Sequence, residues 1–175
     1  MESYPCSTTE VNKEMIFYQL LHLKQIVFEV TDACNLRCKY CGYSELYEGY
    51  DERKNSYFPF KKAQLIIDYL INLWRDNTSP VIIEPLTVGF YGGEPLMNIS
   101  FIKKVVDYIQ QKDLNKCLFF SMTTNAMLLD KYMDYLVEKD FRLLISLDGD
   151  EYAQSYRVDA SGRNSFDKVF ANVMS

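Results

Sequence analysis

The chain of 175 residues is the size of one domain. Its hydrophobic fraction of 48%, with 14 Tyr and 11 Phe, is too high for a disordered chain, and 19 Lys and Arg against 24 Asp and Glu give a net charge of -5. Without a basic block, neither a nucleic acid nor an anionic membrane is an expected partner. No apolar run approaches the ~20 residues of a membrane span, and the acidic N-terminus does not resemble a secretory signal, so we expect a cytoplasmic protein.

Strand-like and helix-like segments alternate along the chain. Short runs of β-branched, aromatic and other apolar residues predict strands at 26–30, 86–91, 118–123 and 143–147. Apolar residues spaced three and four apart predict a helix after each strand, with the stripes Phe60, Ala63, Ile67, Leu70 and Trp74; Ile102, Val105, Val106 and Ile109; Met133, Leu136 and Val137; and Phe166, Val169, Phe170 and Val173. The expected N-caps of the last three helices are Ser100, Asp130 and Ser165.

Four β-α units predict an α/β fold with parallel strands, right-handed crossovers and functional residues at the carboxyl ends of the strands. A complete barrel of eight units takes ~250 residues, so this chain predicts an incomplete, half-barrel-like sheet. We expect residues 1–24 to form an N-terminal extension and residues 25–175 to be the first, truncated part of a larger domain. An open edge at the fourth strand would favour self-association.

Three of the five cysteines lie in one loop after the first predicted strand, at Cys34, Cys38 and Cys41. The spacing CxxxCxxC allows three thiolates to converge on one metal centre, and soft sulfur ligands select zinc, copper(I) or an iron–sulfur cluster. Structural zinc takes four protein ligands, usually in two separated pairs. Three cysteines instead leave one position open for a ligand that is not protein, and they suit a reducing compartment better than a disulfide framework does.

A second candidate motif, Gly92-Gly93-Glu94-Pro95, follows the second predicted strand. The glycines would let the backbone approach a ligand closely, and Glu94 would offer a carboxylate to an ammonium group. Taken alone, the segment could also be a tight turn with a solvent-facing glutamate. The sequence contains neither GxGxxG nor a P-loop, and with His22 as its one histidine it predicts no Ser-His-Asp or Cys-His nucleophilic site.

The cysteine loop resembles that of the radical S-adenosylmethionine (radical SAM) enzymes, in which CxxxCxxC follows the first strand and an aromatic residue, here Tyr40, precedes the last cysteine. The resemblance implies that Cys34, Cys38 and Cys41 hold a 4Fe–4S cluster whose fourth iron binds S-adenosylmethionine. It also implies that one electron cleaves this cofactor to a 5'-deoxyadenosyl radical, which abstracts hydrogen from the substrate. The protein would position the cofactors, with Tyr40 packing on the adenine.

The segments after the next two strands resemble the same family. Gly92-Gly93-Glu94-Pro95 is similar to a GGEP segment whose backbone and acidic side chain bind the methionyl amino group, which implies that role for Gly92, Gly93 and Glu94. Thr123-Thr124-Asn125-Ala126 resembles a TNG segment, with Ala126 in place of glycine, and implies that Asn125 contacts the cofactor. The alternative for Asn125 is that it only holds a turn.

The segment after the fourth strand resembles that of SPASM-associated peptide and protein maturases. Ser146-Leu147-Asp148-Gly149 followed by Arg157 implies Ser146 at the ribose and Arg157 at the carboxylate of the cofactor. These enzymes often carry His-Asp where this chain has Ala153-Gln154, which weakens the assignment of Arg157. A plain turn at Asp148-Gly149 and a surface ion pair for Arg157 are the alternatives.

The sequence therefore predicts the first part of a partial TIM-like radical SAM barrel, without a SPASM region, from an enzyme that acts on a peptide or protein and needs an electron donor. No side chain is assigned a catalytic role. The alternatives are a sulfatase-maturase-like protein oxidant, a small-molecule radical SAM enzyme, and a non-catalytic metal-binding or interaction module. The Tyr-rich segment 43–57 is either a solvated loop or a flap over the cluster.

Overall fold

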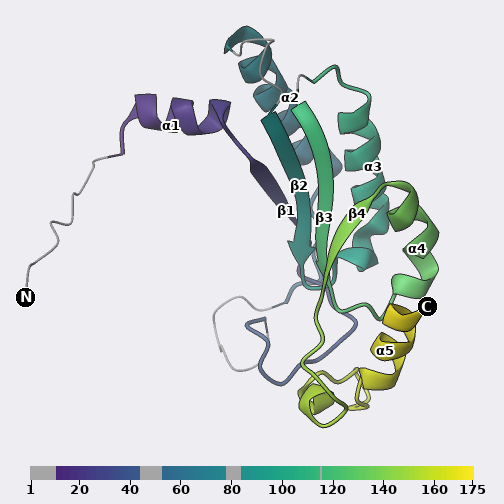
Figure 1. Ribbon diagram of the computed structural model, residues 1–175. Coiled ribbons are helices and arrows are strands. Elements are labelled where there is room, and N and C mark those ends of the chain that lie inside the picture. Colours follow the sequence, from purple (N-terminus) through teal and green to yellow (C-terminus); the bar gives the residue numbers. More distant parts are fainter. Residues whose placement is uncertain (1–10, 44–52, 78–83, 115) are drawn as a thin grey trace, which may run out of the picture.

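The fold is a single sheet of four strands with helices between them (Figure 1), seen in a computed structural model that describes residues 11–43, 53–77, 84–114 and 116–175. The elements in chain order are α1 Lys13–Leu21, β1 Gln25–Thr31, α2 Phe60–Asn77, β2 Glu84–Gly92, η1 Pro95–Asn98, α3 Ile99–Gln110, β3 Lys116–Thr124, α4 Leu129–Glu138, β4 Phe141–Ile145, η2 Ala153–Tyr156 and α5 Phe166–Met174. Within these described ranges, no helix is long and apolar enough to cross a membrane. The predicted alternation of strands and helices is confirmed.

The sheet has the strand order β1-β2-β3-β4, and every neighbouring pair is parallel. Helices α2, α3 and α4 lie on one face of the sheet, and α5 packs beside α4 (Figure 1). Burial alternates along β1, where Phe28 and Val30 are buried while Val27 is 53% exposed on the other face. In the described part of the chain this second face is uncovered, as expected of a partial barrel.

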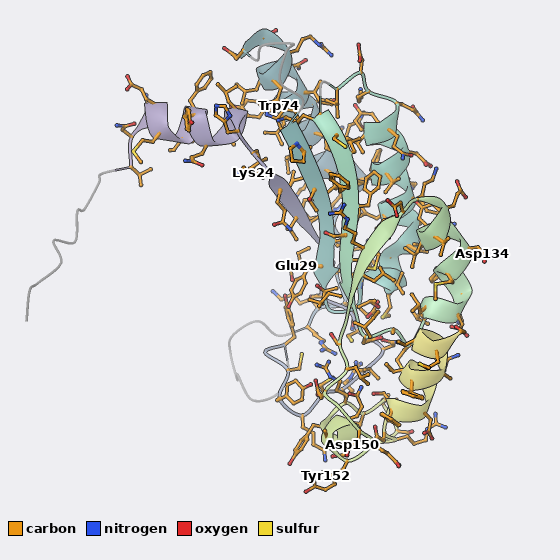
Figure 2. All side chains as sticks on the ribbon, viewed as in Figure 1. Lys24, Glu29, Trp74, Asp134, Asp150 and Tyr152 are labelled. Atoms are coloured by element: carbon orange, nitrogen blue, oxygen red, sulfur yellow. The ribbon has the colours of Figure 1, made fainter. Side chains whose placement is uncertain are left out.

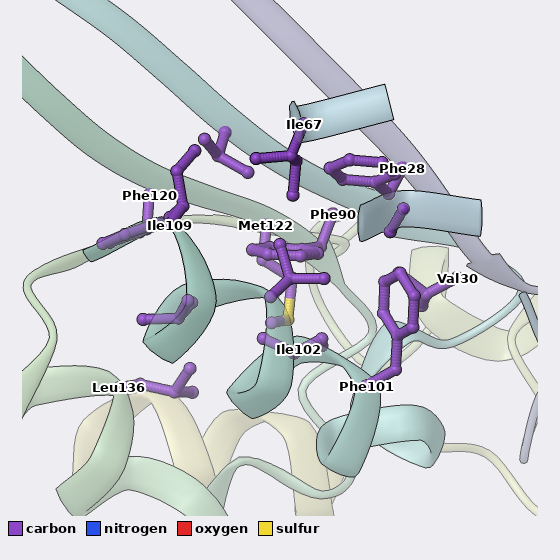
Figure 3. Close-up of a cluster of buried hydrophobic side chains, with 14 of the residues drawn as sticks. Phe28, Val30, Ile67, Phe90, Phe101, Ile102, Ile109, Phe120, Met122 and Leu136 are labelled. Carbon is purple, nitrogen blue, oxygen red and sulfur yellow. The ribbon is translucent and has the colours of Figure 1, made fainter. Parts of the chain in front are cut away.

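The core forms where the strands meet the apolar stripes of α2 and α3. Figure 3 shows the buried side chains of the strands facing those of the helices, with the rings of Phe28, Phe90 and Phe101 close together. The ring of Phe28 lies 6.4 Å from that of Phe90 and 6.0 Å from that of Phe101. The predicted stripes of α2 and α3 are confirmed, since Ile67 and Ile102 and their companions at helical spacing are buried.

Two of the predicted N-caps are wrong. Helix α3 begins at Ile99 because the 3-10 turn η1 leads directly into it, so Ser100 lies inside the helix. Asp130 lies in the first turn of α4 and not at its cap. Ser165 does occupy the N-cap of α5, but the side chain that accepts the hydrogen bond from the Phe166 amide is that of Asn164.

Two further features of the helices differ from the sequence prediction. Three residues of the predicted stripes are exposed: Val137 of α4 is 70% exposed, and Phe170 and Val173 of α5 are 46% and 42% exposed. Helix α1 lies in the expected N-terminal extension and was not predicted, because none of its residues is buried and it has no apolar face for periodicity to detect. The local signal that marks it is Asn12, whose side chain accepts a hydrogen bond from the Met15 amide at 2.9 Å.

Phe90→Ala tests the core. Phe90 is 1% exposed, so we expect this substitution to lower the free energy of unfolding by about 3–5 kcal/mol in guanidinium denaturation followed by circular dichroism. Val137→Ala, at an exposed helix position, serves as the control and is expected to change it by no more than about 0.5 kcal/mol. Equal effects of the two substitutions would contradict the observed packing.

Candidate cofactor site

The carboxyl ends of the four strands lie at one edge of the sheet. The chain passes there from β1 to Cys34, from β2 to Glu94, from β3 to Asn125 and from β4 to Ser146. Figure 2 shows Asp150 and the loop after β4 at this edge, whereas Lys24 and Trp74 lie at the opposite edge. The predicted site residues of all four β-α units therefore share the carboxyl edge of the sheet.

The glycine pair after β2 joins the backbone at the start of the cysteine loop. The amide of Gly93 donates to the carbonyl of Thr31 at 2.7 Å, and that of Glu94 donates to the carbonyl of Ala33 at 2.8 Å. A Cβ at Gly92 would lie 2.2 Å from the Thr31 oxygen, and one at Gly93 would lie 2.2 Å from the Ala33 oxygen. The close approach expected at these glycines is thus made to the chain itself.

Glu94 is completely buried and joins the ends of β2 and β3. Its carboxylate accepts hydrogen bonds from the Thr124 hydroxyl at 2.7 Å, the Asn125 amide at 2.8 Å and the Leu96 amide at 3.0 Å. Burial raises the pKa of this carboxyl, and the three donors oppose that rise. Its expected role as the ligand of an amino group stays a prediction, because in this structure the carboxylate binds groups of the chain.

Asn125 contacts the first cysteine of the loop. Its Nδ2 donates to the Asn35 side chain at 2.8 Å and lies 3.6 Å from Cys34 Sγ, while its Oδ1 accepts from the Met127 amide at 3.0 Å. The turn that it starts places Ala126 at a φ of 59°, in the left-handed region where glycine is usual. Asn125 therefore both holds a turn and reaches the cysteine loop.

The loop after β4 holds the other side of the cysteine loop. The amide of Arg37 donates to the carbonyl of Val158 at 2.6 Å, and that of Lys39 donates to the carbonyl of Tyr156 at 2.9 Å. Within the cysteine loop, the amide of Cys41 donates to the carbonyl of Cys38 at 3.1 Å. Backbone hydrogen bonds to the segments after β2 and β4 thus fix the cysteines in place.

Tyr40 and Arg157 meet on Asp148, which the sequence presented as a possible turn residue. The Tyr40 hydroxyl donates to Asp148 Oδ2 at 2.5 Å, and Arg157 donates to both carboxylate oxygens at 2.9 Å. Arg157 holds the pKa of Asp148 below its usual range, while burial and the hydrogen bond to Asp148 raise the pKa of Tyr40. The ligand roles expected of Tyr40 and Arg157 stay predictions, as does that of Ser146, whose amide donates to the Thr124 carbonyl at 2.9 Å.

The three loop cysteines form no disulfide, and the pKa values of two of them, Cys34 and Cys38, are raised. Burial raises the pKa of Cys34 and Cys38, and the nearby thiol of Cys41 adds to this rise at both. Cations oppose it, foremost Arg53 at Cys34 and Arg157 at Cys38. Cysteine thiolates beside fixed positive charge suit a negatively charged iron–sulfur cluster.

Arg53 is a site residue that the sequence reasoning missed. Its Nη2 donates to Cys41 Sγ at 3.1 Å, and its Nη1 donates to the Leu36 carbonyl at 3.0 Å. Among the described residues, no group of three His, Cys, Asp or Glu side chains is close enough to hold one metal ion. Structural zinc takes four protein ligands, whereas three cysteines would leave one position of a bound centre open, so this donor set suits an iron–sulfur cluster with one non-protein ligand.

Comparison with known proteins identifies the family. A model of the Radical SAM superfamily matches residues 28–174. The chain belongs to the radical SAM superfamily. This superfamily consists of enzymes that use a 4Fe–4S cluster and S-adenosylmethionine, so the family and the α/β partial-barrel fold expected from the sequence are confirmed.

Two relatives of this radical SAM chain are an uncharacterised protein and an enzyme of assigned activity. An uncharacterised protein of Methanocaldococcus jannaschii is 35% identical over 144 residues, which are 82% of this chain and 45% of that protein. A cysteine-type anaerobic sulfatase-maturating enzyme of Clostridium novyi is 27% identical over 155 residues, covering 86% of this chain and 39% of the enzyme. The chain thus spans about two fifths of the length of these relatives.

A solved structure shares the fold. Native anSMEcpe with bound AdoMet and Kp18Cys peptide matches with a TM-score of 0.68 and 21% sequence identity, over 86% of this chain and 39% of that one. The radical SAM chain therefore shares its fold with about two fifths of that structure.

Gly93→Ala tests the contact between β2 and the cysteine loop. The added Cβ would meet backbone oxygens of Ala33 and Asp32, so we expect a loss of about 1–3 kcal/mol in unfolding free energy and a lower Tm. Gly42→Ala is the matched control, because a Cβ at Gly42 meets no atom within 4 Å. If Gly93→Ala melted no earlier than Gly42→Ala, the close approach would be incorrect.

Glu94→Gln tests the buried carboxylate. One carboxylate oxygen becomes an NH2 group that would face a donor, so we expect a loss of about 1–3 kcal/mol in unfolding free energy. The control is Glu138→Gln, at a side chain that is 67% exposed, with an expected change within about 0.5 kcal/mol. Urea denaturation of both variants makes the comparison, and a Glu94→Gln protein as stable as the control would rule out this bonding.

Proposed function

We propose that this chain is part of an enzyme in which Cys34, Cys38 and Cys41 hold a 4Fe–4S cluster, and that S-adenosylmethionine binds beside this cluster. When bound, these cofactors supply a 5'-deoxyadenosyl radical, which abstracts hydrogen from the substrate. The observation that carries the proposal is the hydrogen-bonded contact between the cysteine loop and the Gly92-Gly93-Glu94 segment at the carboxyl edge of the sheet. It joins the loop that carries the proposed cluster ligands directly to the proposed cofactor-binding segment.

The other side chains of the site have binding roles in this proposal. Tyr40 contacts the adenine, Asn125 and Ser146 contact the ribose side of the cofactor, and Arg157 binds its carboxylate. Support comes from position, since Asn125 lies 3.6 Å from Cys34 Sγ and Arg157 lies near Cys38. Arg157 is engaged with Asp148, so carboxylate binding requires this ion pair to open.

The proposed substrate is a residue of a peptide or protein. The similarity to a sulfatase-maturating enzyme and to a solved structure with a bound peptide supports this substrate class. The sulfatase-maturase-like alternative, in which a protein side chain is oxidised, belongs to the same class. The enzyme also needs an external electron donor, which we propose to be a protein, since the cluster must receive one electron for each cleavage.

Three further expectations are proposals of the same kind. Residues 25–175 form the first part of the core domain, and 1–24 form an extension that includes α1. A cytoplasmic location would keep Cys34, Cys38 and Cys41 reduced. Self-association would use β4, which has one strand neighbour in the described sheet.

Anaerobic reconstitution with iron and sulfide tests the proposal. We expect the reduced chain to give an electron paramagnetic resonance signal of a 4Fe–4S cluster that shifts when S-adenosylmethionine is added. Cys34→Ala, Cys38→Ala and Cys41→Ala are each expected to lose this signal, whereas Cys117→Ala, at an exposed cysteine of β3, keeps it. Tight binding of one zinc ion without any cluster would instead support the non-catalytic metal-binding module.

A further inference from the structure

Arg53 places its guanidinium against the third cysteine from a different segment of the chain. Nη2 donates to Cys41 Sγ at 3.1 Å, and Nη1 donates to the carbonyl of Leu36 at 3.0 Å. These two contacts span the cysteine loop and fix the plane of the guanidinium relative to it. The side chain is partly buried, so the contact with sulfur is shielded from water.

The third nitrogen of Arg53, Nε, is buried and has no hydrogen-bond partner among the described residues. Nε is one of two buried side-chain nitrogen or oxygen atoms of the described residues that make no hydrogen bond. A buried donor without an acceptor is unfavourable, and a bound ligand that supplied the acceptor would explain its position. A cluster held by Cys41 would offer further sulfur atoms as hydrogen-bond acceptors to Arg53.

The chemistry of the contact identifies the kind of acceptor. Arginine has donors only, so Cys41 Sγ must accept the hydrogen bond, and a negatively charged sulfur accepts it more strongly than a neutral thiol does. Arg157 differs, because both oxygens of Asp148 offset its charge. Among the described residues, no carboxylate forms an ion pair with Arg53, and its guanidinium instead donates to Cys41 Sγ.

We propose that Arg53 is a positioning residue that sets the reduction potential of the cluster through its hydrogen bond to Cys41. This inference rests on the proposed function. Reduction adds one electron to the cluster, supplied by a low-potential one-electron donor of the reduced flavin or iron–sulfur type, and no bond forms or breaks in this step. The reduced cluster is more negative, so a guanidinium that donates to its sulfur ligand stabilises the reduced state more than the oxidised one.

Potentiometric titration of the reconstituted full chain, followed by electron paramagnetic resonance, tests the inference. In Arg53→Gln the equilibrium constant for reduction is expected to fall about tenfold, equivalent to a shift of about 59 mV to more negative potential. Arg53→Lys keeps the positive charge but lacks the planar set of donors. Its equilibrium constant for reduction is expected to lie between those of the wild type and Arg53→Gln. Iron and sulfide content is measured for every variant, so that loss of cluster is distinguished from a shift in potential.

Lys39→Gln is the matched control. Lys39 lies between two of the cysteines and is exposed, and its amine lies over the Tyr156 ring and not on a sulfur. Its replacement removes the same charge from the same loop, and we expect it to shift the equilibrium constant less than threefold. Equal shifts in Arg53→Gln and Lys39→Gln would overturn the specific role of the hydrogen bond.

A second measurement does not depend on the stability of the glutamine variant. Wild-type protein labelled with 15N in the guanidinium of arginine is expected to show a weak 15N coupling to the reduced cluster by pulsed electron paramagnetic resonance, and Arg53→Lys is expected to lose it. A cluster without this coupling, or with an unchanged potential in both Arg53 variants, overturns the inference but leaves the proposed function standing. A wild-type chain that assembles no cluster overturns both.

Discussion

The site depends on the two backbone hydrogen bonds that tie the start of the cysteine loop to the segment after β2. Gly93 and Glu94 donate to the carbonyls of Thr31 and Ala33, and no side chain larger than hydrogen fits at either glycine of the pair. From this contact the buried Glu94 continues the connection to β3 through Thr124 and Asn125. The first three strand ends are thereby joined by direct hydrogen bonds.

The fourth β-α unit completes the site from the opposite side. Its loop accepts hydrogen bonds from the backbone of the cysteine loop, and Asp148 and Arg157 contact Tyr40 within that loop. Helix α5 supports the third unit, because Asn172 donates to the carbonyl of Ala126 at 2.6 Å. The left-handed turn at Ala126, which costs an alanine about 1–2 kcal/mol, is therefore held from outside by a helix far along the chain.

Local patterns in the sequence were sufficient to predict the strands and the buried stripes of α2 and α3, because each depends on the spacing of nearby residues. The predicted N-cap of α3, Ser100, was wrong because the turn η1, which is capped by Glu94, leads directly into the helix. Asp148 and Arg53 were not recognised as site residues, since their partners Tyr40 and Cys41 lie 108 and 12 positions away. The spacing of residues along the chain does not indicate such pairs, because the partners come from separate segments that only the fold brings together.

Arg157 already binds the carboxylate of Asp148, so a carboxylate ligand could bind Arg157 only by displacing Asp148. Arg157 is only 17% exposed and has already lost most of its water on folding, so an incoming carboxylate replaces one partner with another of the same charge. The displaced Asp148 is also the acceptor for the Tyr40 hydroxyl. Under the proposed binding roles, opening the ion pair at Arg157 would also free the hydroxyl of Tyr40, because both side chains bind the same aspartate.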